Sequence, residues 1–235
     1  LFDEDSSATI SFTATDVDDE DLDISITGGT EITAELLVDT ITFTAVQHFN
    51  GSEEFTLSVS DADYTDAQSI LVTVNPVNDA PILDPIADQS IDEDNTFIYT
   101  LSADDIDGDP LEYTASLNGN GSISVDGTTL SIIPNLNYNG EISVSVTVSD
   151  GQLTDSGSFI LEVLPVNDAP VLADIQDVFF DEDSSTQITL LASDIDQDAL
   201  TFSITGGDAI TADLLDNTIT FTAVQDFNGS EESTI

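Results

Sequence analysis

The sequence contains no lysine and no arginine, whereas aspartate and glutamate together account for 48 of its 235 residues. Because no cationic side chain can balance them, the formal charge of −48 must be neutralised by cations from solution. Nucleic acid is excluded as a direct partner, since nothing in the chain could replace the counterions of a phosphate backbone. Binding to an anionic membrane surface is disfavoured for the same reason.

The chain also lacks cysteine and has a single histidine. Without cysteine there can be no disulfide, and without lysine no isopeptide crosslink, so bound metal ions are the remaining crosslinks. The histidine, His48, is replaced by Asn137 and Asp226 in the repeats described below, and no nucleophile–base pair recurs. Paired carboxylates could hydrolyse glycosides, but here they recur at every repeat rather than in one cleft. We therefore predict that the chain is not an enzyme.

No run of 18 apolar residues occurs, so we expect neither a transmembrane helix nor membrane insertion in this segment. The absence of methionine and of a signal peptide leads us to expect an internal piece of a longer polypeptide. Hydrophobic residues nevertheless make up 40% of the chain, which argues for a folded protein rather than a disordered acidic tail.

Four short motifs recur at a spacing of 89 residues. Asp-Glu-Asp begins at residues 3, 92 and 181, Asp-x-Asp at 16, 105 and 194, and Asn-Gly at 50, 139 and 228. Val-Asn-Asp-Ala-Pro begins at residues 77 and 166. The first and third copies are nearly the same sequence, whereas the middle copy differs. We predict three domains: residues 1–79, lacking the first strand; residues 80–168, complete; and residues 169–235, lacking the last strands.

Within the middle copy, short stretches of alternating apolar and polar residues are separated by turn residues. Residues 142–148 alternate with period two, as a strand with one buried face must. The strands expected are residues 82–91, 96–102, 111–117, 129–133, 141–149 and 158–164. About seven strands per repeat predict an all-β tandem array of Greek-key β-sandwiches. Prolines on both sides of each short linker make it stiff, so we expect the domains to be joined end to end.

The acidic loops are expected to gather where two domains meet. If consecutive strands run in opposite directions, the loop after the first strand of one domain faces the loop after the second strand of the next. The residues expected at the first junction are Asp3, Glu4, Asp5, Asp79, Asp105, Asp107, Asp109 and Asp150. Those expected at the second junction are Asp92, Glu93, Asp94, Glu141, Asp168, Asp194, Asp196 and Asp198.

These clusters predict bound calcium. Two carboxylates about 4 Å apart repel by roughly 4 kcal/mol at an effective dielectric constant near 20, so several cannot share one junction without divalent cations. Hard oxygen ligands in this number suit Ca²⁺, which takes 6–8 oxygen atoms in flexible geometry. The absence of histidine and cysteine from these loops argues against zinc. An isolated Asp-x-Asp loop can be simple turn chemistry, but convergence with the other acidic loops favours a metal site.

The Asn-Asp-Ala-Pro linkers, the acidic glutamate loops and the Asp-x-Asp loops resemble cadherin-type repeats. More narrowly, they are similar to the tandem cadherin-like repeats of large bacterial surface adhesins of the RTX type. The resemblance covers the whole chain and implies Ig-like or cadherin-like domains, a secreted, cell-surface location and calcium ions at each junction. It implies as ligands Glu4, Glu93, Asn78, Asp79, Asn167, Asp168, Asp105, Asp107, Asp194 and Asp196. The chain departs from the cadherin pattern in its shorter linker and in lacking a clear Asp-Arg-Glu motif.

The function favoured by these observations is a calcium-rigidified extracellular spacer, a stalk or filament segment of a repetitive adhesin. Its expected partners are calcium ions and neighbouring repeats, with head-to-tail association of separate chains left open. One alternative is an adhesive module that binds polysaccharide or another cell, which would need exposed aromatic residues. Another is an acidic surface protein of a halophile without specific metal sites, which predicts acid on all faces rather than at loops.

Overall fold

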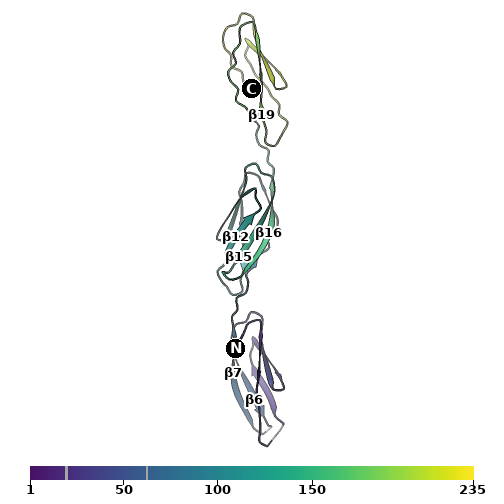
Figure 1. Cartoon of the computed structure of the whole chain (residues 1–235), viewed down its shortest axis with the longest axis vertical. Helices are drawn as coiled ribbons and strands as arrows, with labels where there is room; N and C mark the ends of the chain where they lie inside the picture. The colour runs from purple at the N-terminus through teal and green to yellow at the C-terminus, as the bar shows by residue number, and fades with distance from the viewer. Residues whose placement is uncertain (19–20, 62) are drawn as a thin grey trace.

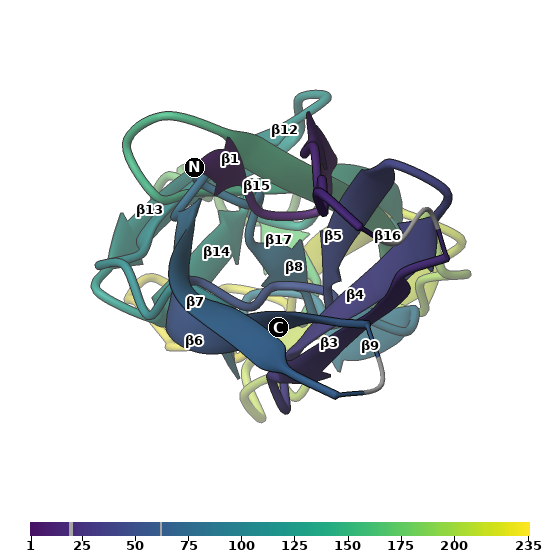
Figure 2. The ribbon, with the colours of Figure 1, turned by 90° about the horizontal axis from the view of Figure 1, so that it is seen from below.

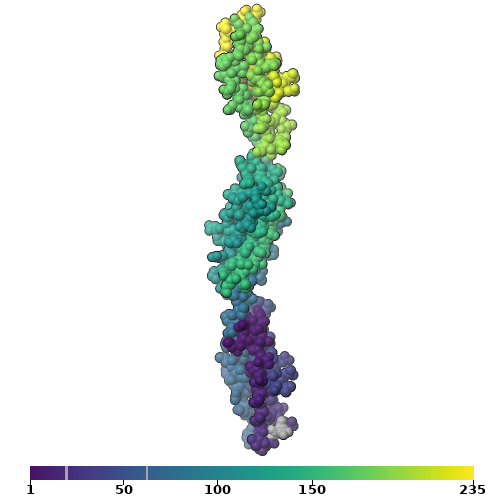
Figure 3. Space-filling model, in the orientation of Figure 1, coloured from purple at the N-terminus to yellow at the C-terminus, as the bar shows by residue number. Residues whose placement is uncertain are grey.

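The structure is a computed structural model that describes residues 1–18, 21–61 and 63–235. In these residues the regular secondary structure is β-strand, and no helix able to cross a membrane is found among them. Three hydrophobic cores, one in each repeat, follow one another along a single long axis (Figures 1 and 3). Seen along that axis, the repeats overlie one another (Figure 2). The prediction of a tandem all-β array joined end to end is therefore confirmed.

The second repeat is a sandwich of two sheets. One sheet has the strand order β12 (Glu112–Leu117), β15 (Gly140–Ser149), β16 (Thr154–Leu164) and β9 (Gln89–Asp92). The other has the order β10 (Phe97–Thr100), β14 (Thr129–Pro134) and β13 (Gly121–Asp126). A short antiparallel pair joins β8 (Ile82–Leu83), which precedes β9 in the chain, to β11 (Ala103–Asp104), which lies between β10 and β12. Neighbouring strands are antiparallel except that β9 pairs in parallel with β16.

Alternating residues of β15 and β16 form the core of this repeat. Ile142, Val144, Val146 and Val148 are fully buried, whereas the serine and threonine residues between them face outward. Phe159 from β16 packs in the same cluster, together with residues of the opposite sheet. The period-two alternation seen in the sequence is thus the alternation of buried and outward faces. Strand β13 was not among the expected strands, because the glycine and asparagine residues before it read as a turn.

The first repeat has the same two sheets. One has the order β1 (Phe2–Asp3), β7 (Thr65–Asn75), β6 (Gly51–Ser60) and β3 (Asp23–Gly28). The other has the order β2 (Ser7–Ser11), β5 (Thr40–Ala45) and β4 (Ile32–Leu37). Strand β1 pairs in parallel with β7, as β9 does with β16, so it supplies the second half of the first strand.

The third repeat contains one full sheet and little of the other. Its elements are the pair β17 (Val171–Leu172) and β19 (Ala192–Ser193), and the sheet β18 (Ser185–Thr189), β21 (Thr218–Ala223) and β20 (Ile210–Leu215). Of the facing sheet, the structure shows an isolated bridge between Thr205 and Thr234. Its buried core is accordingly small and consists of Leu190, Ile219 and Phe221.

Candidate metal-binding junctions

Two short linkers connect the repeats. The first runs between β7 and β8 and the second between β16 and β17, and each has a proline near both ends. We call the residues around them the first junction and the second junction. Figure 1 shows each linker as a single segment of chain between two bodies. The loops at the facing ends of the repeats, together with the linker itself, therefore make up each junction.

A buried glutamate lies beneath the start of each linker. Glu4 is 5% exposed and Glu93 is 3% exposed, the two buried charged residues in the described part of the chain. Parallel pairing of β1 with β7 and of β9 with β16 brings each glutamate to this place. Oε1 of Glu4 accepts the backbone N–H of Val77 at 2.6 Å, and Oε1 of Glu93 accepts that of Val166 at 2.7 Å. Each carboxylate thus anchors the linker through one oxygen.

The Asp-x-Asp loop of the following repeat holds the linker from the other side. The backbone N–H of Asp79 donates to Oδ2 of Asp107 at 2.7 Å. Asp105 shapes the loop, since its Oδ1 accepts the backbone N–H groups of Asp107 at 3.0 Å and Asp109 at 3.1 Å. The second junction repeats each bond with the counterpart residues Asp168, Asp196, Asp194 and Asp198. The first aspartate of each loop therefore stabilises the turn by accepting hydrogen bonds from the loop backbone, and it uses one of its two carboxylate oxygens to do so.

Other carboxylate oxygens at the junctions are buried without a hydrogen bond. Among the described residues these atoms are Oε2 of Glu4, Oδ2 of Asp105 and Oδ2 of Asp168. Burying an anionic oxygen without a partner is costly, because the desolvation of the charge is not compensated. The two oxygens of the first junction come from different repeats, and the third belongs to the linker of the second junction. This donor set, made of oxygen atoms alone, fits a hard cation such as Ca²⁺.

The charges of the second junction act on Asp168. Burial raises the pKa of this carboxyl, and the negative charges of Asp196, Asp94, Glu93 and Asp194 raise it further. The structure thus brings carboxylates from both repeats close to the linker aspartate. Repulsion from these charges destabilises the ionised form of Asp168, and a bound cation would offset that repulsion.

A polar contact joins the linker of the first junction to the loop between β15 and β16. The side-chain amide of Asn78 donates to Oδ2 of Asp150 at 2.8 Å, and the amide of Gln152 donates to Oδ1 of Asn78 at 2.8 Å. The hydrogen bond from Asn78, together with the backbone N–H groups of Gln152 and Leu153, lowers the pKa of Asp150. Asn167, the counterpart of Asn78, donates to the backbone carbonyl of Asp168 at 2.9 Å.

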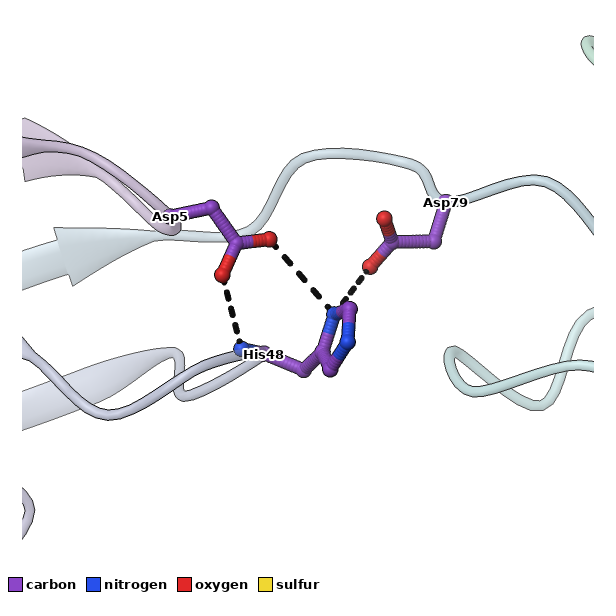
Figure 4. A group of neighbouring side chains, drawn as sticks. All are labelled: Asp5, His48 and Asp79. Carbon is purple, nitrogen blue, oxygen red and sulfur yellow. Dashed lines mark hydrogen bonds and ion pairs between the residues drawn. The ribbon is translucent and has the colours of Figure 1, made fainter.

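His48 also belongs to the first junction, although the sequence analysis placed no histidine in the junction loops. It lies in the loop between β5 and β6, where its backbone N–H donates to Oδ1 of Asp5 at 3.1 Å. Its Nδ1 is 2.8 Å from Oδ2 of Asp79 and 3.5 Å from Oδ2 of Asp5 (Figure 4). The hydrogen bond to Asp79 raises the pKa of His48, as do the charges of Asp79, Asp5 and Glu4.

The docking of this loop is a feature of every repeat. The backbone N–H of Asn137 donates to Oδ1 of Asp94 at 2.9 Å, and that of Asp226 donates to Oδ1 of Asp183 at 3.0 Å. If consecutive strands alternate in direction, the loop before each Asn-Gly lies at the same end of its repeat as Asp-Glu-Asp. That placement was the signal from which the position of His48 could have been found.

Asp3, Asp92 and Glu141 are expected residues for which the described part of the structure shows no contact with the linker. Oδ1 of Asp3 accepts the side-chain amide of Asn75 at 3.0 Å, and Asp92 is exposed. Glu141 is exposed on β15, where it pairs across the sheet with Glu162 of β16. Because Ile142 points into the core, its neighbour Glu141 points away from it.

Solved structures similar to this chain have low sequence identity. The endo-fucoidan hydrolase MfFcnA4 from glycoside hydrolase family 107 is 19% identical, with 88% of this chain and 34% of that chain covered and a TM-score of 0.34. The chain thus spans about a third of that relative. Human protocadherin-24 EC1-2 is 15% identical, with 66% and 87% covered and a TM-score of 0.48. Drosophila N-cadherin EC1-3 is 14% identical, with 71% and 63% covered and a TM-score of 0.35.

None of the curated proteins matches the chain. The model of the bacterial Ig domain, in contrast, matches three successive segments, residues 1–74, 78–162 and 167–235. These segments correspond to the three repeats and leave only a few linker residues between them. The Ig-like repeat expected from the sequence is therefore confirmed. Since nearly the whole chain is matched, it belongs to the bacterial Ig domain family.

Proposed function

We propose that this chain is a calcium-stiffened segment of an extracellular stalk or filament. The observation that carries the proposal is the set of buried, unpartnered carboxylate oxygens of Glu4, Asp105 and Asp168 at the junctions. These anions need a counter-charge, and the chain has no lysine or arginine to supply one. A cation from solution is the partner that remains.

The donor set favours calcium over magnesium. The residues that would hold it are Glu4, Asp5, Asp79, Asp105 and Asp107 at the first junction, and Glu93, Asp94, Asp168, Asp194 and Asp196 at the second. Calcium accepts several carboxylates in flexible geometry, whereas Mg²⁺ requires a near-ideal octahedron and retains water. When bound, the ion supplies positive charge that links the base of one repeat, the linker and the Asp-x-Asp loop of the next.

Such crosslinks suit a spacer. The repeats lie end to end, and the linkers between them are too short to form a core of their own (Figure 1). Ions at the junctions would fix the angles between successive repeats, so that the rod holds a more distant part of the protein away from a cell. Bacterial Ig domains commonly occur in extracellular or surface proteins, and Ig-like repeats are typically non-enzymatic. The proposal therefore includes a cell-surface location in a large adhesin of the RTX type and no catalysis.

The test is small-angle X-ray scattering of the whole chain with excess Ca²⁺ and after chelation, combined with calorimetric titration of Ca²⁺. We expect saturable binding and a longer maximum dimension with calcium, because repulsion between carboxylates no longer bends or frees the junctions. Asp39→Asn provides the matched control, because it removes an exposed carboxylate that lies away from the junction. Asp39 adjoins the first residue of β5, and the His48 loop follows the last residue of that strand. Absence of Ca²⁺ binding, or scattering that chelation leaves unchanged, would contradict the proposal.

A further inference from the structure

We propose that the first junction contains a site for a borderline transition-metal ion such as Zn²⁺, formed by His48, Asp5 and Asp79. The three residues come from three separate segments: the loop after β1, the loop between β5 and β6, and the linker. Figure 4 shows the imidazole between the two carboxylates. Each residue offers one ligand atom, and these atoms lie within 4.8 Å of one another.

The distances suit a tetrahedral ion. Zinc binds histidine nitrogen at 2.0–2.1 Å and carboxylate oxygen at 2.0–2.2 Å, so two ligand atoms at tetrahedral positions are about 3.3 Å apart. Nδ1 of His48 is 2.8 Å from Oδ2 of Asp79 and 3.5 Å from Oδ2 of Asp5. Both distances from the imidazole nitrogen are therefore within about 0.5 Å of the spacing that two tetrahedral ligands need. The ion would take the place of the Nδ1 proton that is otherwise shared with Asp79.

The site is held in place before any ion binds. The backbone N–H of His48 is bonded to Oδ1 of Asp5, which leaves Oδ2 of the same carboxylate directed at the imidazole (Figure 4). Both residues adopt the left-handed backbone conformation, with φ of 58° at His48 and 56° at Asp5. This backbone conformation is uncommon for residues other than glycine. Ligands that are already oriented lose less entropy on binding.

A second observation indicates that the site lacks positive charge. Oε2 of Glu4 is buried without a hydrogen bond, and Glu4 itself is only 5% exposed. Glu4 precedes Asp5 in the chain, and its charge is among those that raise the pKa of His48. A dication at the imidazole would compensate this third carboxylate as well as the two that bind it. The nitrogen ligand favours zinc, copper or nickel over calcium, because imidazole suits borderline metals.

The second junction supplies a natural comparison. Asn137 occupies the place of His48, with φ of 55° and with the same backbone bond to an aspartate, Asp94. An asparagine side chain offers no nitrogen lone pair to a metal. The two junctions of one chain should therefore differ in metal preference, with oxygen-only ligands at the second and a mixed set at the first.

The test is calorimetric titration of Zn²⁺ into the whole chain, compared with the His48→Asn variant. Asparagine already occupies this backbone position in the second repeat, so the variant is expected to fold. We expect one Zn²⁺ per chain at the first junction and a loss of affinity of roughly tenfold or more in His48→Asn. Equal Zn²⁺ affinity in the two proteins would mean that only carboxylates bind the ion, and the proposal would be wrong.

The reciprocal variant, Asn137→His, should create a second Zn²⁺ site with Asp94 and Asp168. A direct readout is the ¹⁵N resonance of the His48 imidazole, which should shift when Zn²⁺ binds. A resonance unmoved by saturating Zn²⁺ would overturn the proposal. The inference shares Asp5 and Asp79 with the calcium proposal and adds the imidazole nitrogen of His48 as a ligand. His48→Asn should therefore still bind Ca²⁺. A wild type that binds Zn²⁺ but not Ca²⁺ would contradict the proposed function and leave this inference intact.

Discussion

The backbone N–H of Asp79 donates to the carboxylate of Asp107 across the boundary between two repeats, at 2.7 Å. The same bond recurs at the second junction between Asp168 and Asp196, also at 2.7 Å. The backbone N–H of a linker residue is thus held by the Asp-x-Asp loop of the repeat that follows it. Because this bond is made by a carboxylate in a loop rich in aspartate, we expect its strength to depend on the cations available in solution.

Removing one of these bonds should loosen one junction and leave the other intact. In Asp107→Ala we expect Ca²⁺ affinity at the first junction to fall roughly tenfold or more, since a ligand and the linker anchor are both lost. Asp196→Ala should do the same at the second junction. Calorimetry and residual dipolar couplings of each repeat measure affinity and relative orientation separately. If either variant disturbs both junctions equally, the ions are not confined to the junctions as proposed.

Calcium and sodium should have different effects on thermal stability. A specific site predicts that millimolar Ca²⁺ raises the unfolding temperature, while NaCl of the same ionic strength raises it much less. Mg²⁺ should be intermediate or weaker because of its stricter geometry. Calorimetric scans in the three salts measure this. If all three salts stabilise equally at matched ionic strength, the halophile alternative without specific sites is favoured instead.

Glu53 gives the first repeat a pH dependence that the second lacks. Hydrogen bonds from the hydroxyl of Thr30 and from the backbone N–H groups of Glu31 and Ile32 lower the pKa of Glu53 from 4.5 to about 2. Since the pKa is lower in the folded state, this carboxylate stabilises the fold above the unfolded value. That contribution is lost as the pH falls from about 4.5 towards 2. In the second repeat the equivalent position is Ile142, which is buried in the core.

The corresponding experiment is urea unfolding of the wild type and of Glu53→Gln, followed by circular dichroism at about pH 6 and about pH 3. We expect the variant to be less stable than the wild type near neutral pH and the difference to shrink in acid. Glu54→Gln, an exposed neighbour on the same strand, is the control and should show neither effect. A destabilisation that is independent of pH would show that the charge of Glu53 is not responsible.

The third repeat should exchange its backbone amides faster than the second. Its buried core has three residues, Leu190, Ile219 and Phe221, whereas the core of the second repeat has both sheets in place. Local stability follows the buried apolar area, so fewer buried side chains protect the amides of β20 and β21. Hydrogen exchange followed by mass spectrometry measures each repeat in the same sample. Equal protection of β21 and β15 would contradict this expectation.

The alternation of residues 142–148 was enough to predict both a strand and its buried face, and the structure confirms the tandem sandwich fold. The motif spacing likewise predicted which loops recur. The limits of each domain, at residues 79 and 168, stay a prediction, as does the binding of calcium. Strand β13 was missed because glycine and asparagine precede it, and these residues occur in turns as well as at strand starts.

The candidate site was predicted less completely than the fold. Glu4, Asp79, Asp105 and Asp107 lie at the first junction as expected, because each is fixed by a motif whose place in the sandwich follows from strand order. Glu141 faces outward beside Glu162, which the burial of Ile142 could have indicated. His48 was considered only for catalysis and was not assigned to the junction, because its loop carries no acidic motif.

By itself, the sequence determined what depends on local order: the 89-residue repeat, the period-two strands, and the turns that Asp105 and Asp194 make with their own backbone. The repeat is read directly from the recurring motifs, and the strands and turns involve residues close in the chain, whose geometry the backbone limits. Only the tertiary structure decided which carboxylate oxygens are left buried without a partner, and that His48 lies between Asp5 and Asp79. Those contacts join segments distant in sequence, and their distances depend on how two packed repeats meet across a short linker.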